Sequence, residues 1–396
     1  MKKSFYRIER LPPYVFAEVN KIKAEARKRG EDIIDFGMGN PDSPTAPHIV
    51  DKLCETARDP KAHRYSVSQG IFGLRKAVAG YYSRRFGVEL NPDDEIVVSL
   101  GSKEAYVHLA MAISKPGDNV LVTNPCYPIH AFGFSLAGAN VNYLPKDFKT
   151  EDPTGKFLQQ VKDAVENSAQ KPMAVVVNYP CNPTAETCTL DFYQELVDYC
   201  LKKDVIIISD LAYCDIYFGS EPPPSIFQIK GAKDIAVELT SASKSYSMAG
   251  WRVGFTVGNK DVIYALKRLK SYLDYGAFTP IQVATAAALN GPQDCVEENR
   301  QRYKSRRDVL IQGLHEAGWD VKIPEASMFI WAEIPEKFKS MGSLEFSKLL
   351  LTKAQVAVSP GIGFGENGND YVRIAMIENK HRTRQAMRNI KQTLKK

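Results

Sequence analysis

The chain has 396 residues, of which 44% are hydrophobic and 25% charged, and its formal net charge is +6. This balance is typical of a globular protein large enough for two or three domains. It contains neither an apolar run of membrane-spanning length nor a basic stripe that would indicate nucleic-acid binding. The seven cysteines form no Cys-x-x-Cys pair and no apolar stretch follows the basic N-terminus, so we expect reduced thiols, a cytoplasmic location and no metal site.

The first forty residues contain a helical pattern near 15–28 and then the Gly-rich turn Phe36-Gly37-Met38-Gly39-Asn40-Pro41. From about residue 95 to 260, short β-branched runs alternate with helical patterns, which predicts a mostly parallel α/β sheet that binds ligands at the carboxyl ends of its strands. The predicted strands are Glu95–Val98, Asn119–Thr123, Ala139–Tyr143, Met173–Asn178, Val205–Ser209, Ile235–Leu239 and Arg252–Val257, and the predicted helices include Ser102–Ile113 and Leu190–Lys203.

A smaller α+β domain is expected in the C-terminal part of the chain. It would begin with a long helix over 296–317, continue with strands at 329–333, 356–358 and 371–374, and close with a basic helix. We therefore expect an N-terminal arm (1–45) that joins the small domain, a large domain (46–290) and a small domain (291–396).

Two polar residues follow the strand predicted at 205–209. Asp210 stands where open α/β sheets bind ligands, although a carboxylate in such a place is more often a helix cap or a turn former. Tyr213, three residues later, is by itself more consistent with a core or surface position.

Lys244 lies in the segment Ser241-Ala242-Ser243-Lys244-Ser245-Tyr246-Ser247-Met248-Ala249-Gly250-Trp251-Arg252-Val253-Gly254. A lysine in a serine-rich turn is normally a solvated charge, but the neighbours here are small or apolar. A partly desolvated lysine loses proton affinity and becomes a nucleophile for carbonyl compounds. The serines and Arg252 could together bind a phosphate.

Three further positions belong with this set. Ser102 begins a helical pattern, where free N–H groups suit a phosphate, although a Ser N-cap is favoured when the position is taken alone. Asn182 lies in the tightly shaped loop 178–184. Arg373, flanked by apolar strand residues, needs an anion, which is equally a protein carboxylate or a substrate carboxylate. The order and spacing of all these residues indicate a site for a pyridine aldehyde phosphate and an amino acid.

The segment 241–254 resembles the lysine signature of the class I/II, fold-type I pyridoxal-phosphate aminotransferases, and the resemblance runs from about Arg10 to the C-terminus. The likeness is greatest to the bacterial glutamate–pyruvate (alanine) aminotransferases, on the motifs Arg10-Leu11-Pro12-Pro13-Tyr14-Val15-Phe16, Gly37-Met38-Gly39-Asn40-Pro41-Asp42 and Ser359-Pro360-Gly361-Ile362-Gly363-Phe364-Gly365. The resemblance implies pyridoxal 5′-phosphate as cofactor and a three-layer large domain with a mostly parallel seven-stranded sheet, joined to a smaller α+β domain.

The resemblance also implies roles around the cofactor ring. Lys244 would hold the cofactor as a Schiff base and then carry the proton between the substrate Cα and the cofactor C4′. Asp210 would pair with the pyridinium nitrogen and keep it protonated. Tyr213 and Asn182 would donate hydrogen bonds to the phenolate oxygen, and Tyr127 would stack on the ring.

The phosphate and the substrate would bind at either side of that ring. The phosphate would be held by Ser102, the backbone of Lys103, Ser241, Ser243 and Arg252, and by Tyr65 across a dimer interface. The α-carboxylate of the substrate would be held by Arg373, Asn182 and the backbone of Gly39. Cis peptide bonds are implied before Pro125 and Pro183.

One departure from the family concerns the distal carboxylate of a dicarboxylic substrate. Aspartate aminotransferases place an arginine of the partner subunit over it, but the matching stretch 271–278 contains no arginine. We expect the side chain of Lys103 to take the distal carboxylate of glutamate instead.

The expected function is that of a homodimeric, cytoplasmic aminotransferase with shared active sites and a ping-pong mechanism. Its partners would be an amino acid and a 2-oxo acid, with no nucleic acid and no membrane. Alanine with 2-oxoglutarate is the leading pair, ahead of aspartate and diaminopimelate. A pyridoxal-phosphate lyase or decarboxylase would share Lys244 and Asp210, and a lyase would release ammonia from a single substrate. A non-enzymatic ligand sensor is less consistent, because the residues before the Gly-rich turn are too few for a DNA-binding segment.

Overall fold

The computed structural model describes residues 5–13 and 15–395. The basic residues 1–4, and Tyr14 of the 10–16 motif, lie outside the described residues. Within the described chain a seven-stranded sheet has the order β2-β8-β7-β6-β5-β3-β4, and only β8 runs antiparallel to its neighbours. Its strands are β2 (Ile96–Ser99), β3 (Asn119–Asn124), β4 (Asn140–Pro145), β5 (Ala174–Asn178), β6 (Ile206–Asp210), β7 (Ala236–Ser241) and β8 (Gly254–Gly258). Each predicted strand is confirmed.

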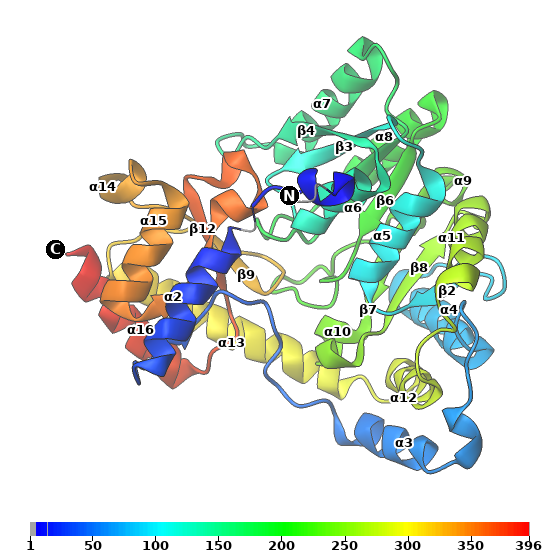
Figure 1. Cartoon of the computed structure of the whole chain (residues 1–396), viewed down its shortest axis with the longest axis horizontal. Coiled ribbons are helices and arrows are strands. Elements are labelled where there is room, and N and C mark those ends of the chain that lie inside the picture. Colours follow the sequence, from blue (N-terminus) through cyan, green and yellow to red (C-terminus); the bar gives the residue numbers. More distant parts are fainter. Residues whose placement is uncertain (1–4, 14, 396) are drawn as a thin grey trace.

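Helices cover both faces of this sheet, which gives three layers (Figure 1). The β-branched strands are buried on both sides, so Val176 faces one core while Val175 and Val177 face the other. One face packs against α5 (Ser102–Ile113), α6 (Pro128–Ala137) and α11 (Lys260–Leu273). The other packs against α3 (Pro47–Ala57), α4 (Phe72–Phe86), α7 (Pro153–Asn167), α8 (Leu190–Lys203) and α12 (Thr279–Asn290).

The carboxyl ends of the parallel strands meet at one edge of the sheet. Polar residues end the strands there, namely Ser99, Asn124, Asn178, Asp210 and Ser241. The first residue of β8, Gly254, pairs with both Ser99 and Ser241, so the loop before β8 also reaches this edge. The topology therefore brings the polar segments at 99–102, 178–182, 210–213 and 241–252 together.

A second, smaller unit contains an antiparallel sheet of β11 (Ser359–Pro360), β12 (Tyr371–Ala375) and β9 (Phe329–Glu333). A short parallel pair joins β1 (Ile34–Asp35) to β10 (Val356–Ala357). Around these strands lie α2 (Phe16–Lys28), α13 (Asp294–Glu316), α15 (Gly342–Leu349) and α16 (Lys380–Leu394). The predicted long helix and the strands of this region are confirmed.

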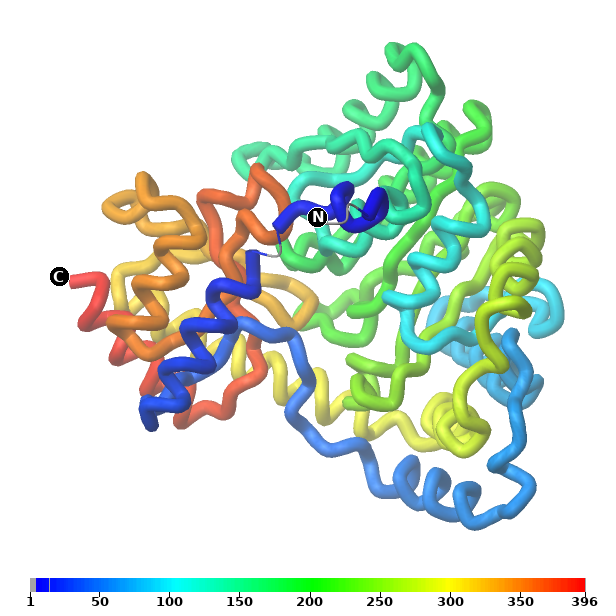
Figure 2. The backbone as a smooth tube through the Cα atoms, in the orientation of Figure 1, coloured from blue at the N-terminus to red at the C-terminus, as the bar shows by residue number. Residues whose placement is uncertain are grey.

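The N-terminal segment lies beside the C-terminal part of the chain. Figure 2 shows the blue segment next to the orange and red ones before it continues to α3. Val19 and Ile33 share a small core with Leu351 and Ala357, which explains why α2 packs here and not on the large sheet. This arrangement carries the Gly-rich turn at 36–41 toward the edge where the strands end.

One local prediction differs from the structure, and another is confirmed with an addition. The strand expected from Arg252 begins at Gly254, because Arg252 adopts a left-handed conformation (φ 56°) after a short 3₁₀ turn at Ala249–Trp251. The expected cis peptides before Pro125 and Pro183 are confirmed, and a third precedes Pro180. In the described part of the chain no helix combines the length and apolarity needed to cross a bilayer.

Candidate active site

A cavity of about 440 Å³ opens where the strand ends of the large sheet face the small sheet. It is lined by twelve of the thirteen residues predicted for the site, namely Gly39, Ser102, Lys103, Tyr127, Asn182, Asp210, Tyr213, Ser241, Ser243, Lys244, Arg252 and Arg373. Tyr65 does not line it. Residues from seven separate stretches of the chain thus converge on one cavity.

Lys244 lies in the single helical turn α10 (Ala242–Ser245), directly after β7. Its Nζ donates a hydrogen bond to the carbonyl oxygen of Gly39 (2.6 Å) and lies 6.0 Å from the centre of the Tyr213 ring. Burial, together with the nearby positive charges of Arg373 and Arg252, lowers the pKa of the Lys244 ammonium to about 8. The amine is therefore a much better nucleophile near neutral pH than an ordinary lysine.

Asp210, the last residue of β6, is buried at the cavity wall. Its Oδ2 lies 2.9 Å from Nε2 of His130, and its Oδ1 accepts a hydrogen bond from the backbone N–H of Ala212 (3.1 Å). Sequence reasoning missed His130, a fully buried residue of α6. It follows Tyr127, the N-cap of α6, by three residues, so the two ring centres lie 5.7 Å apart, and this spacing was the available signal.

The first turn of α5 and Arg252 form a cradle for an anion. A Cβ added to Gly101, which has φ +90°, would collide with the guanidinium of Arg252, and one added to Gly254 would collide with the backbone nitrogen of Ser102. The Oγ of Ser241 accepts a hydrogen bond from the N–H of Ser243 (3.1 Å). A helix N-terminus, an arginine and two hydroxyls so close together are suited to a phosphate.

Arg373 is buried in the middle of β12, opposite Trp331 and Ser359. Its Nη1 donates to Oδ1 of Asn182 (2.8 Å) and its Nη2 to the carbonyl oxygen of Gly37 (3.0 Å). The guanidinium carbon lies 4.1 Å from the ring centre of Phe329 and 4.6 Å from that of Phe364. These rings, together with Gly37, hold the guanidinium at the cavity wall and were not predicted from the sequence.

The described lining carries more positive than negative side chains. Its cations are Lys23, Lys103, Lys244, Arg252 and Arg373, and its carboxylates are Asp35 and Asp210. Five positive against two negative groups, with Lys244 only partly protonated near its lowered pKa, favour ligands that carry several negative charges.

Tyr65 lies on the surface with 86% of its area exposed, and its ring centre is 4.7 Å from that of Tyr275. Val67, Tyr272 and Phe278 are also exposed hydrophobic residues of the same two segments, 65–72 and 272–278. We call this surface the Tyr65–Tyr275 patch. Such a concentration of exposed aromatic side chains is typical of a protein–protein contact.

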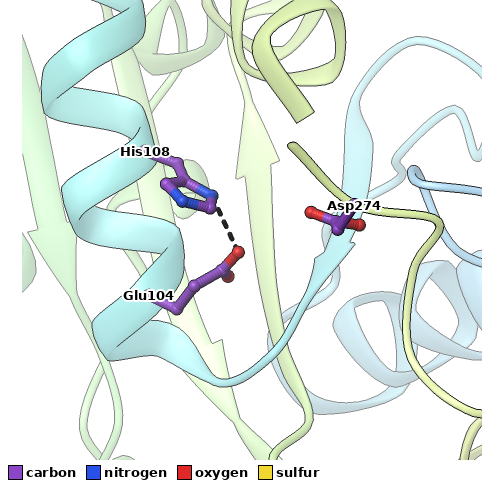
Figure 3. Close-up of side chains that lie close together, drawn as sticks. All are labelled: Glu104, His108 and Asp274. Atoms are coloured by element: carbon purple, nitrogen blue, oxygen red, sulfur yellow. Dashed lines mark ion pairs between the residues drawn. The ribbon is translucent and has the colours of Figure 1, made fainter. Parts of the chain in front are cut away.

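Glu104, His108 and Asp274 come close enough together to share a cation (Figure 3). The buried ammonium of Lys270 lies 2.7 Å from Oδ2 of Asp274 and 3.5 Å from Oε1 of Glu104. A lysine of the chain therefore already supplies positive charge to both carboxylates.

Comparisons with known proteins show the family of the chain. Residues 31–390 match the family model "Aminotransferase class I and II". The chain is 57% identical to AatC of Rhizobium meliloti (98% of this chain, 95% of the relative) and 52% identical to the glutamate-pyruvate aminotransferase AlaC of Escherichia coli (98% and 93%). It is 42% identical to an LL-diaminopimelate aminotransferase of Halothermothrix orenii (97% of both chains). A mutant aspartate aminotransferase from Thermus thermophilus superposes with a TM-score of 0.90 at 26% identity, over 99% of this chain and all of that one.

The side chains of the cavity fit the cofactor on which this family depends. Pyridoxal phosphate needs an amine for its aldehyde, a carboxylate for its ring nitrogen and an anion cradle for its phosphate. Lys244, Asp210 and the cradle around Gly101 and Arg252 provide these three groups in one cavity. The chain belongs to the pyridoxal-phosphate-dependent class I and II aminotransferases.

Proposed function

We propose that the protein transfers the amino group of alanine to 2-oxoglutarate in two half-reactions that share one site. The observation that carries this choice of substrates is the 52% identity, over 98% of the chain, to a glutamate-pyruvate aminotransferase. The excess of positive side chains in the cavity supports an acceptor with two carboxylates.

When bound, pyridoxal phosphate supplies a ring that accepts the electrons released as the substrate Cα loses its proton. We assign Lys244 both the covalent attachment of the cofactor and the transfer of that proton to the cofactor C4′. Its lowered pKa, about 8, matches the acid–base task at neutral pH. Asp210, oriented by His130, would keep the ring nitrogen protonated.

The remaining cofactor contacts keep the assignments expected from the family. Tyr213 and Asn182 would hydrogen-bond the ring oxygen, and Tyr127 would lie against the ring. The phosphate would be held by Ser102, the Lys103 backbone, Ser241, Ser243 and Arg252, with Tyr65 reaching it from a second copy of the chain. The exposure of the Tyr65–Tyr275 patch supports such a homodimer.

Arg373, with Asn182 and the backbone of Gly39, would hold the α-carboxylate of every substrate. We propose that Lys103, exposed in the first turn of α5, takes the second carboxylate of glutamate or 2-oxoglutarate. Lys103→Ala should then raise the KM for glutamate about tenfold and leave the KM for alanine unchanged. Lys115→Ala, just beyond the other end of α5, is the control. An unchanged KM for glutamate in the folded Lys103→Ala enzyme would exclude this role.

A diaminopimelate aminotransferase is the second candidate, because a relative with that name is 42% identical over 97% of both chains. Aspartate is a further alternative donor.

We also propose the division into an arm (1–45), a large domain (46–290) and a small domain (291–396). The separate cores of the large sheet and of the C-terminal part support it. The seven free thiols support a cytoplasmic location.

A scan of half-reactions tests the proposed function. The purified enzyme with its cofactor is mixed with one amino acid at a time, and the absorbance of the bound cofactor and the release of 2-oxo acid are followed. We expect alanine and glutamate to release about one equivalent of 2-oxo acid per site, without ammonia. Faster conversion of diaminopimelate would favour the second candidate. Continuous ammonia release from one substrate would indicate a lyase.

A further inference from the structure

Asp35 lies at the end of β1 and lines the same cavity as Lys244 and Arg373. Its side chain is only 18% exposed. Its Oδ2 accepts hydrogen bonds from Nζ of Lys23 (2.8 Å) and from Nη2 of Arg27 (3.3 Å), both on α2. Nothing in the assigned roles uses this carboxylate, although it stands in a cavity that must attract anions.

The other carboxylate oxygen of Asp35 holds Gly37. Oδ1 accepts a hydrogen bond from the N–H of Gly37 (3.0 Å). The carbonyl oxygen of Gly37 accepts hydrogen bonds from Nη2 of Arg373 (3.0 Å) and from Oγ of Ser359 (2.6 Å). Gly37 is thus fixed by Asp35 through its N–H and contacts Arg373 through its carbonyl group.

The backbone around β1 explains why a side chain is needed at this point. Ile34 and Phe36 donate their N–H groups to the carbonyl oxygens of Gln355 and Ala357 (2.9 and 2.8 Å). The N–H of the next residue, Gly37, is bound by the Asp35 side chain instead. Asp35 therefore restrains the backbone of Gly37 directly before the carbonyl group that Arg373 contacts.

We infer that Asp35 is a positioning residue, which acts through Gly37 to hold the Arg373 guanidinium in the orientation that binds a carboxylate. The inference rests on the proposed role of Arg373. A guanidinium that keeps both of its anchors loses little side-chain freedom when the substrate carboxylate arrives, so the carboxylate binds more tightly.

Lys23 and Arg27 form a matched pair on the same carboxylate oxygen. Lys23 is 14% exposed and lines the cavity, whereas Arg27 is 52% exposed and does not. Lys23 therefore orients the Asp35 side chain. Its positive charge also reduces the repulsion between Asp35 and the incoming substrate carboxylate. Arg27 contributes from the solvent side, where its charge is screened.

The test compares L-alanine with L-alaninamide, which keeps the amine but lacks the negative carboxylate. The enzyme with its bound cofactor is prepared as Asp35→Ala, Asp35→Asn, Lys23→Gln and Arg27→Gln. Binding is followed by the absorbance of the cofactor, and the alanine half-reaction gives KM and kcat. We expect Asp35→Ala to raise the KM for alanine about tenfold, with kcat and the alaninamide dissociation constant nearly unchanged.

The other variants distinguish the positioning role of Asp35 from the effect of its negative charge. Asp35→Asn keeps an oxygen for the Gly37 N–H, so we expect a smaller rise in KM. Lys23→Gln should raise the KM for alanine and Arg27→Gln should leave it unchanged. If the charge of Asp35 alone mattered, both Asp35 variants would lower this KM, which would overturn the inference.

If Asp35→Ala weakened the binding of alanine and of alaninamide equally, Asp35 would be merely structural and the inference would be overturned. A wild-type KM for alanine in Asp35→Ala would also overturn it, because Asp35 would then be irrelevant to substrate binding. If Lys23→Gln and Arg27→Gln changed the KM for alanine equally, Lys23 would have no role beyond that of Arg27. A wild-type enzyme that reacts with no amino acid would instead contradict the proposed function itself.

Discussion

The Nε2 atom of His130 lies 2.9 Å from the Oδ2 atom of Asp210; both side chains are buried, and Asp210 lines the cavity. A buried carboxylate is costly unless hydrogen bonds compensate for its lost hydration. His130, on α6, provides one of these bonds. The orientation of the Asp210 side chain therefore depends on α6 as well as on its own strand, β6.

This contact predicts a graded loss of activity. Asp210→Ala should lower kcat by about 10²–10³-fold, because the ring nitrogen would lose its anionic partner. His130→Gln should lower it by only about tenfold, since Asp210 would remain but lose one hydrogen bond. Half-reaction rates with alanine measure both. His108→Gln, outside the cavity on α5, is the control, and a larger loss in His130→Gln than in Asp210→Ala would contradict this order.

The lowered pKa of Lys244 predicts how the cofactor-free enzyme takes up pyridoxal phosphate. Because only the neutral amine attacks an aldehyde, the uptake rate should rise with pH below about 8 and level off above it. A lysine with an ordinary pKa of 10.5 would show a rate that still increases at pH 10. Stopped-flow absorbance measured from about pH 6.5 to about pH 10 distinguishes the two profiles.

The cradle at Gly101 predicts a defect in cofactor binding. In Gly101→Ala the new methyl group would displace the guanidinium of Arg252, so the dissociation constant of pyridoxal phosphate should rise by about tenfold or more. Gly117→Ala is a matched control, because Gly117 has φ +89° against +90° for Gly101 but no atom within 4 Å of the added Cβ. Equilibrium dialysis measures the affinity. Equal effects in both variants would attribute the loss to backbone strain.

The Tyr65–Tyr275 patch predicts a change in assembly. Tyr275→Asp would place a charge in an aromatic contact and should shift the chain toward monomers, with weaker cofactor binding because Tyr65 could no longer reach a second copy. Met341→Asp, at another exposed hydrophobic residue, should leave the assembly unchanged. Sedimentation velocity and cofactor titration test this. A Tyr275→Asp enzyme that stays dimeric would place the subunit contact elsewhere.

Much of the fold followed from local patterns. The strands of the large sheet are β-branched and bounded by turns, so their positions were predictable within two residues. The start of β8 differs from the prediction by two residues, since Arg252 adopts a left-handed conformation where its guanidinium packs against Gly101.

The residues that line the cavity were predictable where their chemistry suits a cofactor or a substrate, as with Lys244 and Asp210. The site was less predictable where a residue acts through another one. The roles of His130 and Asp35 depend on which strand end or backbone group lies next to them, although each is near a motif of the sequence. Such contacts arise only when distant segments are brought together.

The carbonyl groups of Gly37 and Gly39, which bind Arg373 and Lys244, come from a segment far in sequence from both. A protease that removed the first forty residues would spare every side chain of the phosphate cradle. The same cut would remove the two carbonyl groups that hold Arg373 and Lys244, and also Ile34 and Phe36 from the core of the smaller unit. Loss of the N-terminal segment would therefore affect the contacts of Arg373 and Lys244 without altering a side chain of the phosphate cradle.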